Sequence, residues 1–246
     1  MRFLVALLLG IASNLALADR WVPQDDVLLA AIRDGNVDLF RAMLKEGGSI
    51  QARTALGDNA LTMALLSDDD RMISEVLSHR PDLNARGGTG FTPLGLAVER
   101  GNEKALRRLI KVGADVDLAD ASGATPLLDA IRLERSTFAS ALLDAGADPN
   151  RADRDGSTAL HAAAEHGQEQ IARQLLEHDA EPNALDREKR SPFFIALLSG
   201  HPEIAELLMR DPRTDPSQIT QGYPARFWAS QFDDSQLVEL IDRRLR

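Results

Sequence analysis

The sequence predicts an all-α solenoid of stacked helix-turn-helix units whose tips are β-turns or β-hairpins, and two observations lead to this fold class. A short sequence motif that begins with a hydroxyl residue recurs every 33 residues without insertion, at Thr92, Thr125, Thr158 and Ser191. Alanine keeps the same interval at Ala31, Ala64, Ala97, Ala130, Ala163, Ala196 and Ala229. A fixed period of about 20 to 50 residues indicates stacked repeats. A small residue at a fixed place in each unit marks close packing of one helix on the next.

Two sets of apolar residues, each spaced 33 positions apart and called columns here, define the core and the number of units. The first holds Leu28, Leu61, Leu94, Leu127, Leu160 and Phe193. The second holds Met43, Val76, Leu109, Leu142, Leu175 and Leu208. The columns predict a single array over 19–246, with repeats at about 25–57, 58–90, 91–123, 124–156, 157–189 and 190–222 and a C-terminal cap at 223–246. A core of small apolar side chains suits a chain that is 44% hydrophobic but only 4% aromatic.

Within a unit, glycine and aspartate mark the turn that precedes the first helix. Glycine lies two residues before the hydroxyl residue in most units, and Lys189 interrupts this column. A glycine at a fixed loop position predicts a positive φ. Asp120, Asp153 and Asp186 lie three residues before that position and are expected to hydrogen-bond their own turns. Each unit then reads as turn, short helix, tight connection, longer helix and loop, with the third unit's helices at about 93–100 and 103–112.

The ends of the array depart from the pattern as terminal repeats should. The first unit lacks the repeated motif, and the last carries Phe227, Trp228 and Phe232 where small residues are expected. Terminal repeats face water on one side, so we interpret both ends as caps. Arg243, Arg244 and Arg246 are expected to favour the negative end of the final helix dipole.

The motif and the loop that ends each unit resemble the ankyrin-repeat family. The family signature Thr-Pro-Leu-His-x-Ala is represented at 158–163 by Thr-Ala-Leu-His-Ala-Ala, and variants occur at 92–97 and 125–130. The loops at 113–117 and 146–150 also match the family. The resemblance covers the chain from about Asp25 to its end. It implies that the imidazole of His161 ties its turn by hydrogen bonds. It also implies that a partner protein is bound on a concave face by residues that differ between repeats.

The positions that the family pattern leaves free lie at the turn tips and on the first helices. We therefore predict partner-binding residues at Thr89, Phe91, Glu99, Arg100, Ser122, Ala124, Arg132, Leu133, Arg154, Asp155, Ser157, Glu165, His166, Arg187, Glu188 and Arg190. The last tips are densely charged and mixed in sign, which favours steering and partner choice more than affinity. The competing interpretation is that these residues are solvated loop ends that keep the protein soluble.

The sequence offers no constellation for catalysis, a cofactor or a metal. The chain has no cysteine, which removes thiol nucleophiles and cysteine-based zinc sites. His161 and His166 are five residues apart, whereas a zincin helix places its two histidines four apart. The acidic run at 67–70 lacks the spaced oxygens of an EF-hand and predicts a helix start. We expect a protein that is not an enzyme. The competing hypothesis is a site assembled around His161 and Glu165.

The first residues predict a removable export signal. Arg2 precedes an apolar run at 3–11, and Ala16-Leu17-Ala18 is a small-x-small cleavage pattern. We therefore expect a signal peptide at 1–18, cleavage after Ala18 and no membrane insertion afterwards. The alternative, a membrane anchor, needs about 20 apolar residues, which this segment does not supply.

The net charge of the chain and its predicted export indicate which kinds of partner to expect. The formal net charge is -10 and no dense basic patch opposes it, which disfavours nucleic acid as a partner. We expect a non-catalytic protein-protein interaction module of the bacterial periplasm, a monomer apart from its partner and without a cofactor. A narrower version is an inhibitor or immunity protein for an exported enzyme. The alternative is a secreted effector whose array docks on a host protein.

Overall fold

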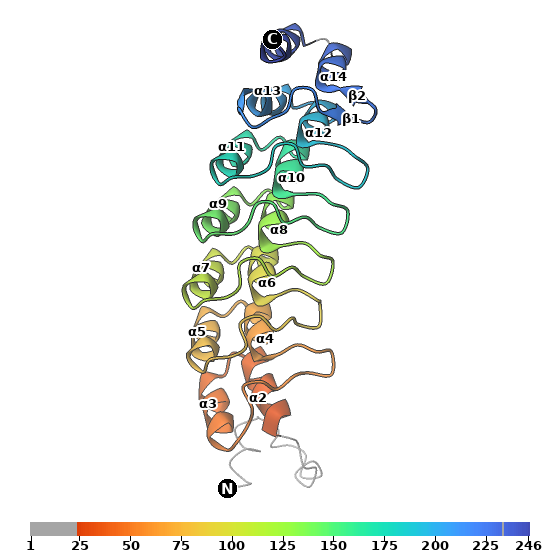
Figure 1. Cartoon of the computed structure of the whole chain (residues 1–246). Helices are drawn as coiled ribbons and strands as arrows, with labels where there is room; N and C mark the ends of the chain where they lie inside the picture. Colours follow the sequence, from red (N-terminus) through yellow and green to blue (C-terminus); the bar gives the residue numbers. More distant parts are fainter. Residues whose placement is uncertain (1–23, 233) are drawn as a thin grey trace. The chain divides into compact units, whose positions relative to one another are not determined.

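A computed structural model describes residues 24–232 and 234–246 (Figure 1). This part of the chain is mostly helical, and the prediction of an all-α repeat solenoid is confirmed. It forms two compact units, of which unit 1 ends at Thr89 and unit 2 runs from Gly90 to Arg246. The predicted signal peptide at 1–18 lies outside the described residues. Within the residues that are described, no helix is both long and apolar enough to cross a membrane.

Unit 1 contains two helix pairs, α2 (Gln24–Arg33) with α3 (Val37–Lys45) and α4 (Ala60–Ser67) with α5 (Asp70–Ser78). Leu61 and Val76, one from each apolar column, are fully buried in its core. The acidic run at 67–70 leads into α5, as predicted. The carboxylate of Asp69 caps the helix by accepting hydrogen bonds from two backbone N–H groups of the first turn.

Unit 2 contains helix pairs that stack in sequence order, each with an inner helix followed by an outer helix (Figure 1). The pairs are α6 (Pro93–Arg100) and α7 (Glu103–Lys111), α8 (Pro126–Arg132) and α9 (Ser136–Asp144), α10 (Ala159–Glu165) and α11 (Glu169–Glu177), α12 (Pro192–Leu198) and α13 (Pro202–Arg210), and α14 (Ala225–Gln231) and α15 (Ser235–Arg244). The two helices predicted for the third unit agree with α6 and α7 to within one residue. A loop, called a hairpin below, precedes each inner helix. In the last hairpin, β1 (Ile219–Thr220) pairs antiparallel with β2 (Tyr223–Pro224).

The hydroxyl residue of the repeated motif starts the inner helix because it caps the helix N-terminus. Thr92 Oγ1 accepts from the backbone N of Gly95 at 3.0 Å, and Ser191 Oγ accepts from the backbone N of Phe194 at 3.3 Å. These bonds satisfy backbone donors that have no partner inside the helix. Proline follows the cap in α6, α8 and α12, where a missing N–H removes no helical hydrogen bond.

The alanine column lies where neighbouring inner helices of unit 2 pack together. Its members there are fully buried: Ala97, Ala130, Ala163, Ala196 and Ala229. Because protein interiors are close-packed, a larger side chain at these positions would push adjacent inner helices apart. The packing role that the sequence predicted for alanine is confirmed.

Side chains in the loops after the outer helices join each repeat of unit 2 to the next. Asn150 accepts from the backbone N of Glu181 at 2.7 Å and donates to the backbone O of Asp179 at 3.0 Å. One repeat later, Asn183 makes the equivalent two bonds at 2.7 and 2.8 Å. These contacts hold neighbouring repeats in register.

Aromatic residues and one arginine close the C-terminal repeat. The rings of Tyr223 and Phe227 stack with centroids 4.1 Å apart, and Trp228 lies 4.6 Å from Phe194 of the preceding repeat. The guanidinium of Arg244 donates to four backbone oxygens at the end of α13 and in the loop that follows, over 2.6 to 3.2 Å. This contact with the preceding repeat was not predicted. The last repeat is therefore fixed by polar bonds as well as by aromatic packing.

Candidate functional site

The hairpins before α8, α10 and α12 are each shaped by an aspartate at their start, as the sequence predicted. The Oδ1 of Asp153 accepts from the backbone N of Asp155 at 2.8 Å and from that of Ser157 at 2.9 Å. Gly156 then adopts a φ of 78°, which a side chain would oppose. In the next hairpin Lys189 occupies the same place with a φ of 58°. The hairpin before α12 thus keeps the shared turn while presenting an additional exposed cation.

Neighbouring hairpins are tied together at their tips. The backbone N of Arg187 donates to the backbone O of Asp155 at 2.9 Å. The guanidinium of Arg154 reaches one hairpin back and donates to the backbone O of Ala121 at 2.6 Å. These bonds fix the exposed tip residues of neighbouring hairpins relative to one another.

His161 has the structural role that the family resemblance implied. Its Nδ1 lies 2.8 Å from Thr158 Oγ1 and 3.2 Å from the Thr158 backbone N, and its Nε2 lies 3.1 Å from the backbone O of Arg190. Burial lowers the pKa of His161, which favours the neutral ring. His166 is half-buried and its Nδ1 lies 3.8 Å from a carboxylate oxygen of Glu134. Both rings therefore have neighbours that account for their positions.

Two of the cations predicted to contact a partner form ion pairs within unit 2. Arg132 at the end of α8 forms an ion pair with Asp153 of the following hairpin. Arg190 Nε donates to Asp186 Oδ2 at 2.7 Å, and its Nη1 lies 3.1 Å from Glu188. The carboxylates of Asp153 and Asp186 are largely buried, so these pairs stabilise the hairpin bases. Both arginines are half-buried and keep only part of their surface for a partner.

Asp129 of the inner helix α8 is a half-buried residue with one buried carboxyl oxygen. Its Oδ2 is buried and has no hydrogen-bond partner among the described residues. Burial raises the pKa of Asp129 to about 7, with Asp120 and Glu99 adding to the shift and Arg132 opposing it. The group therefore titrates near neutral pH, where most carboxylates are fully ionised.

Most of the predicted partner-binding residues are at the surface. The exposed ones are Thr89 of unit 1 and, in unit 2, Glu99, Arg100, Ser122, Leu133, Arg154, Asp155, Glu165, Arg187 and Glu188. Those that are half-buried are Phe91, Arg132, Ser157, His166 and Arg190. Ala124 is only 3% exposed because it lies at the base of its hairpin next to the capping Thr125. Ala124 therefore leaves the set of candidate contact residues.

The exposed large apolar side chains of unit 2 gather on the hairpins and on the carboxyl ends of the inner helices. They are Leu185, Ile219 and Tyr223 on the hairpins and Leu133, Leu198 and Phe232 at the helix ends, with only Val112 and Leu245 at the ends of outer helices. Leu133 was predicted, but Leu198 and Phe232 were missed. The repeat spacing could have identified both, because Leu198 lies one repeat (33 residues) after Glu165 and Phe232 lies two repeats (66 residues) after His166.

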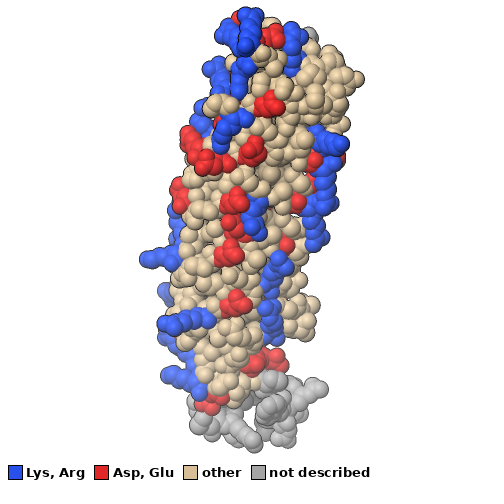
Figure 2. Space-filling view, viewed as in Figure 1, with Lys and Arg blue, Asp and Glu red and all other residues tan. Residues whose placement is uncertain are grey.

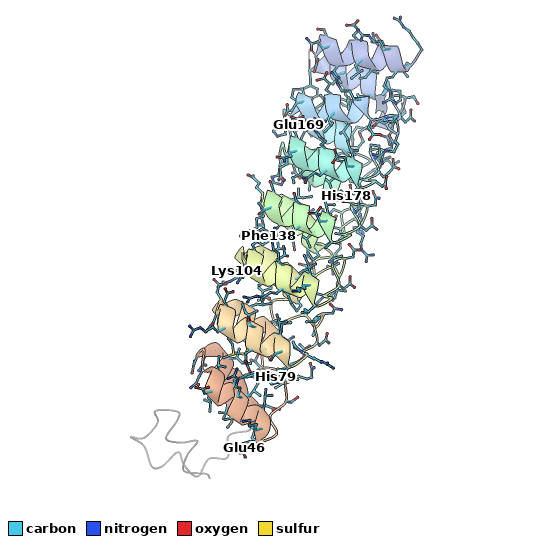
Figure 3. The ribbon with its side chains drawn as sticks, turned by 90° about the vertical axis from the view of Figure 1, so that its left-hand side faces the viewer. Glu46, His79, Lys104, Phe138, Glu169 and His178 are labelled. Atoms are coloured by element: carbon cyan, nitrogen blue, oxygen red, sulfur yellow. The ribbon has the colours of Figure 1, made fainter. Side chains whose placement is uncertain are left out.

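Charged groups also lie on the hairpins. Figure 2 shows lysine and arginine side chains along the edge where Figure 1 places the hairpins before α10 and α12. Arg154, Arg187 and Lys189 are exposed there, beside Asp155 and Glu188. The outer helices appear in Figure 3 with mixed polar side chains such as Lys104 on α7 and Glu169 on α11. Exposed apolar and basic groups thus both occur on the hairpins of unit 2, while the outer helices α7 and α11 carry exposed cations such as Arg107 and Arg173 as well.

Comparison with protein families agrees with this architecture. The family model described as ankyrin repeats (3 copies) matches residues 67–153 and 141–220, more than half of the chain. The chain belongs to the ankyrin-repeat family. No curated protein sequence matches it. Ankyrin repeats generally mediate protein-protein interaction, and ankyrin-repeat proteins are typically non-catalytic, so a protein partner is suggested.

Proposed function

We propose that this ankyrin-repeat protein is a non-catalytic binding module that recognises a partner protein through the hairpins and inner-helix ends of unit 2. The observation that carries the proposal is the distribution of exposed apolar side chains, which favours this side over the outer helices. Scattered single apolar residues are ordinary on protein surfaces, whereas apolar residues gathered on one side are typical of an interaction surface.

The charged residues at the hairpin tips also favour an interface on this side of unit 2. Arg187 and Lys189 are exposed on the hairpin before α12. Among the described residues, no three His, Asp or Glu side chains are placed to hold a metal ion. Charges at the edge of an interface steer encounter and select partners, and their effect weakens as salt rises. We therefore infer that the tips form the polar rim and the inner-helix ends the centre of the interface.

A quantitative pull-down with charge-reversed proteins tests this assignment. The double variant Arg187→Glu/Lys189→Glu should capture the partner at least about fivefold less well at low salt than the unmodified protein. The matched control is Arg107→Glu/Arg173→Glu, which reverses two exposed cations on the outer helices α7 and α11. Equal capture by both variants, or a greater loss with the outer-helix control, would place the interface elsewhere.

We also infer that the protein acts outside the cytoplasm, in a bacterial periplasm. Support comes from Arg2, the apolar run at 3–11 and the Ala16-Leu17-Ala18 pattern. Expression in a Gram-negative bacterium, followed by fractionation and N-terminal sequencing, tests the inference. A periplasmic protein that begins at Asp19 is expected. Recovery from the medium favours an effector instead, and a cytoplasmic protein that begins at Met1 would refute export.

The narrower proposal is that binding inhibits an exported enzyme or protects the cell against it. Support comes from the combination of a predicted export signal with a binding fold whose sequence predicts no catalytic constellation. The test is to assay the captured partner, with and without a molar excess of this protein, for hydrolysis of cell-envelope polymers. Loss of activity on addition is expected, and unchanged activity would contradict inhibition.

A further inference from the structure

We propose that the hairpin before α8 is a pH-sensitive element, held closed by a proton where arginine holds the next two hairpins. The proton is carried by a group of three carboxyl side chains, called the carboxyl cluster below. Its members are Glu99 in the last turn of α6, Asp120 at the start of the hairpin and Asp129 in α8. The inference goes beyond the proposed function and does not depend on it.

The next two hairpins each pair their first aspartate with an arginine. Asp153 forms an ion pair with Arg132 of the preceding inner helix, and Asp186 forms one with Arg190 of its own hairpin. Both carboxylates are largely buried. A buried carboxylate is costly unless it is paired and hydrogen-bonded, so the guanidinium groups stabilise these two hairpins in the ionised form.

The hairpin before α8 lacks such an arginine. Its Asp120 Oδ1 accepts from the backbone N of Ala124 at 3.1 Å, so the turn itself is the same. Among residues 24–232 and 234–246, however, Asp120 forms no ion pair. The reason lies in the sequence, because Glu99 stands one repeat before Arg132 and Ala124 stands two repeats before Arg190.

Asp129 adds a third carboxyl group to this place. Its column holds buried apolar residues in the preceding repeat and in the two that follow, namely Leu96, Ala162 and Ile195. The Asp129 Oδ2 is buried and has no hydrogen-bond partner within the part of the chain that the structure describes. It lies against Gly95 of α6, where an added Cβ would be 3.9 Å from this oxygen. Such a position disfavours the ionised form of the carboxyl group.

The charges closest to Asp129 mostly favour its protonated form. Burial and the charges of Asp120 and Glu99 raise the pKa of Asp129 to about 7. Arg132, one turn further along α8, opposes the shift. Arg100 follows Glu99 directly and is exposed. The carboxyl cluster therefore holds a proton below neutral pH and releases it above.

Charged groups on the neighbouring elements contact other atoms. Arg135, which precedes α9, donates to the backbone O of Glu99 at 3.0 Å. On α10, His161 is bonded within its own turn, and the charge of Glu165 acts on Arg190. Asp129 thus remains the member of this part of unit 2 whose charge changes near neutral pH.

The change in charge alters how easily the hairpin opens. When the hairpin opens, Asp129 meets water and its pKa returns toward the ordinary value of 3.8, so opening releases a proton. Opening therefore becomes easier as pH rises toward about 7 and is constant above that value. The hairpin before α10 should not respond, because burial opposes but hydrogen bonds from Arg132 and the turn lower the pKa of Asp153.

Hydrogen exchange of the full-length protein, followed by NMR, tests the proposal. Protection of the backbone N–H groups of Ser122 and Ala124, corrected for the intrinsic effect of pH on exchange, should fall at least about tenfold between pH 5 and pH 8. The backbone N–H groups of Asp155 and Ser157, in the hairpin before α10, are the internal control and should keep their protection. An equal fall in both hairpins, or none in the first, would overturn the inference.

Variants of the carboxyl cluster separate titration from a general effect on folding. Asp129→Asn should remove the pH dependence of the first hairpin, and so should Asp129→Leu, which restores an apolar residue to the column. Glu99→Gln removes one source of repulsion, so the fall in protection should end at a lower pH than in the unmodified protein. The control Asp144→Asn removes an exposed carboxylate from α9 and should change nothing. A pH dependence that persists without Asp129, or that Glu99→Gln leaves unshifted, would contradict the proposal.

Discussion

Arg190 Nε donates a 2.7 Å hydrogen bond to Asp186 Oδ2 within the hairpin that precedes α12. The Asp186 side chain is almost fully buried, and its other oxygen accepts from the backbone N of Arg190 at 2.8 Å. The pair places a structural cation only three residues from an exposed one, Arg187. Similar arginines on one hairpin therefore have different roles.

Reversal of the charge at Arg190 should destabilise the protein. Arg190→Glu leaves Asp186 buried beside a like charge, and we expect a loss of about 1–3 kcal/mol in the free energy of unfolding. Arg187→Glu, the control on the same hairpin, should change it by less than about 0.5 kcal/mol. Urea unfolding followed by circular dichroism measures both values, and equal stability of the two variants would show that the pair contributes nothing.

Replacement of Asp129 should stabilise the protein at alkaline pH. The folded-state pKa of about 7 exceeds the ordinary value of 3.8, so between these values the folded state holds a proton that the unfolded state has released. The contribution of Asp129 to stability therefore falls as pH rises through this range and is constant above it. Asp129→Asn removes this loss, and we expect a gain of about 1–3 kcal/mol at pH 8 but little at pH 4.5.

Urea unfolding at both pH values tests this dependence. The exposed Asp155→Asn is the control, and its difference from the unmodified protein should not change with pH. If the gain from Asp129→Asn is the same at pH 4.5 and pH 8, the buried carboxyl group does not titrate as described.

Loss of Arg244 should loosen the last repeat. Arg244→Ala removes charged hydrogen bonds to four backbone oxygens of the preceding repeat. Because such bonds each contribute about 1.5–3 kcal/mol, amide protection in α14 and α15 should fall at least tenfold in hydrogen exchange. The control Arg243→Ala removes only an exposed pair with Glu239. Protection that is equal in the two variants would contradict the role of Arg244.

The sequence was sufficient to predict the fold because each repeated residue has a local task. Thr92 and Ser191 cap helices, Asp153 closes its turn, and His161 contacts the hydroxyl of Thr158 in its own turn, all within five residues of chain. Such tasks recur at a fixed spacing and are visible as columns. The helices of the third unit were predicted to within one residue for this reason.

The candidate site was less predictable because exposure and pairing depend on neighbouring repeats. Arg132 and Arg190 occupy variable positions, yet nearby carboxylates bind both. Ala124 also occupies a variable position, and the packing at its hairpin base buries it. Leu198 and Phe232 were not predicted, because the predicted contact residues on the inner helices end at His166, although the same columns continue through α12 and α14.

Site-specific photo-crosslinking tests the central claim most directly. A benzophenone amino acid in place of Leu198 at the carboxyl end of α12 should crosslink the captured partner efficiently, and the same group in place of Val112 at the end of α7 should not. Both positions are similarly exposed, at 58% and 50%, so accessibility alone does not separate them. Crosslinking at Leu198 with at least about tenfold preference is the predicted result. Equal crosslinking at both positions, or a preference for Val112, would contradict binding through the inner-helix side of unit 2.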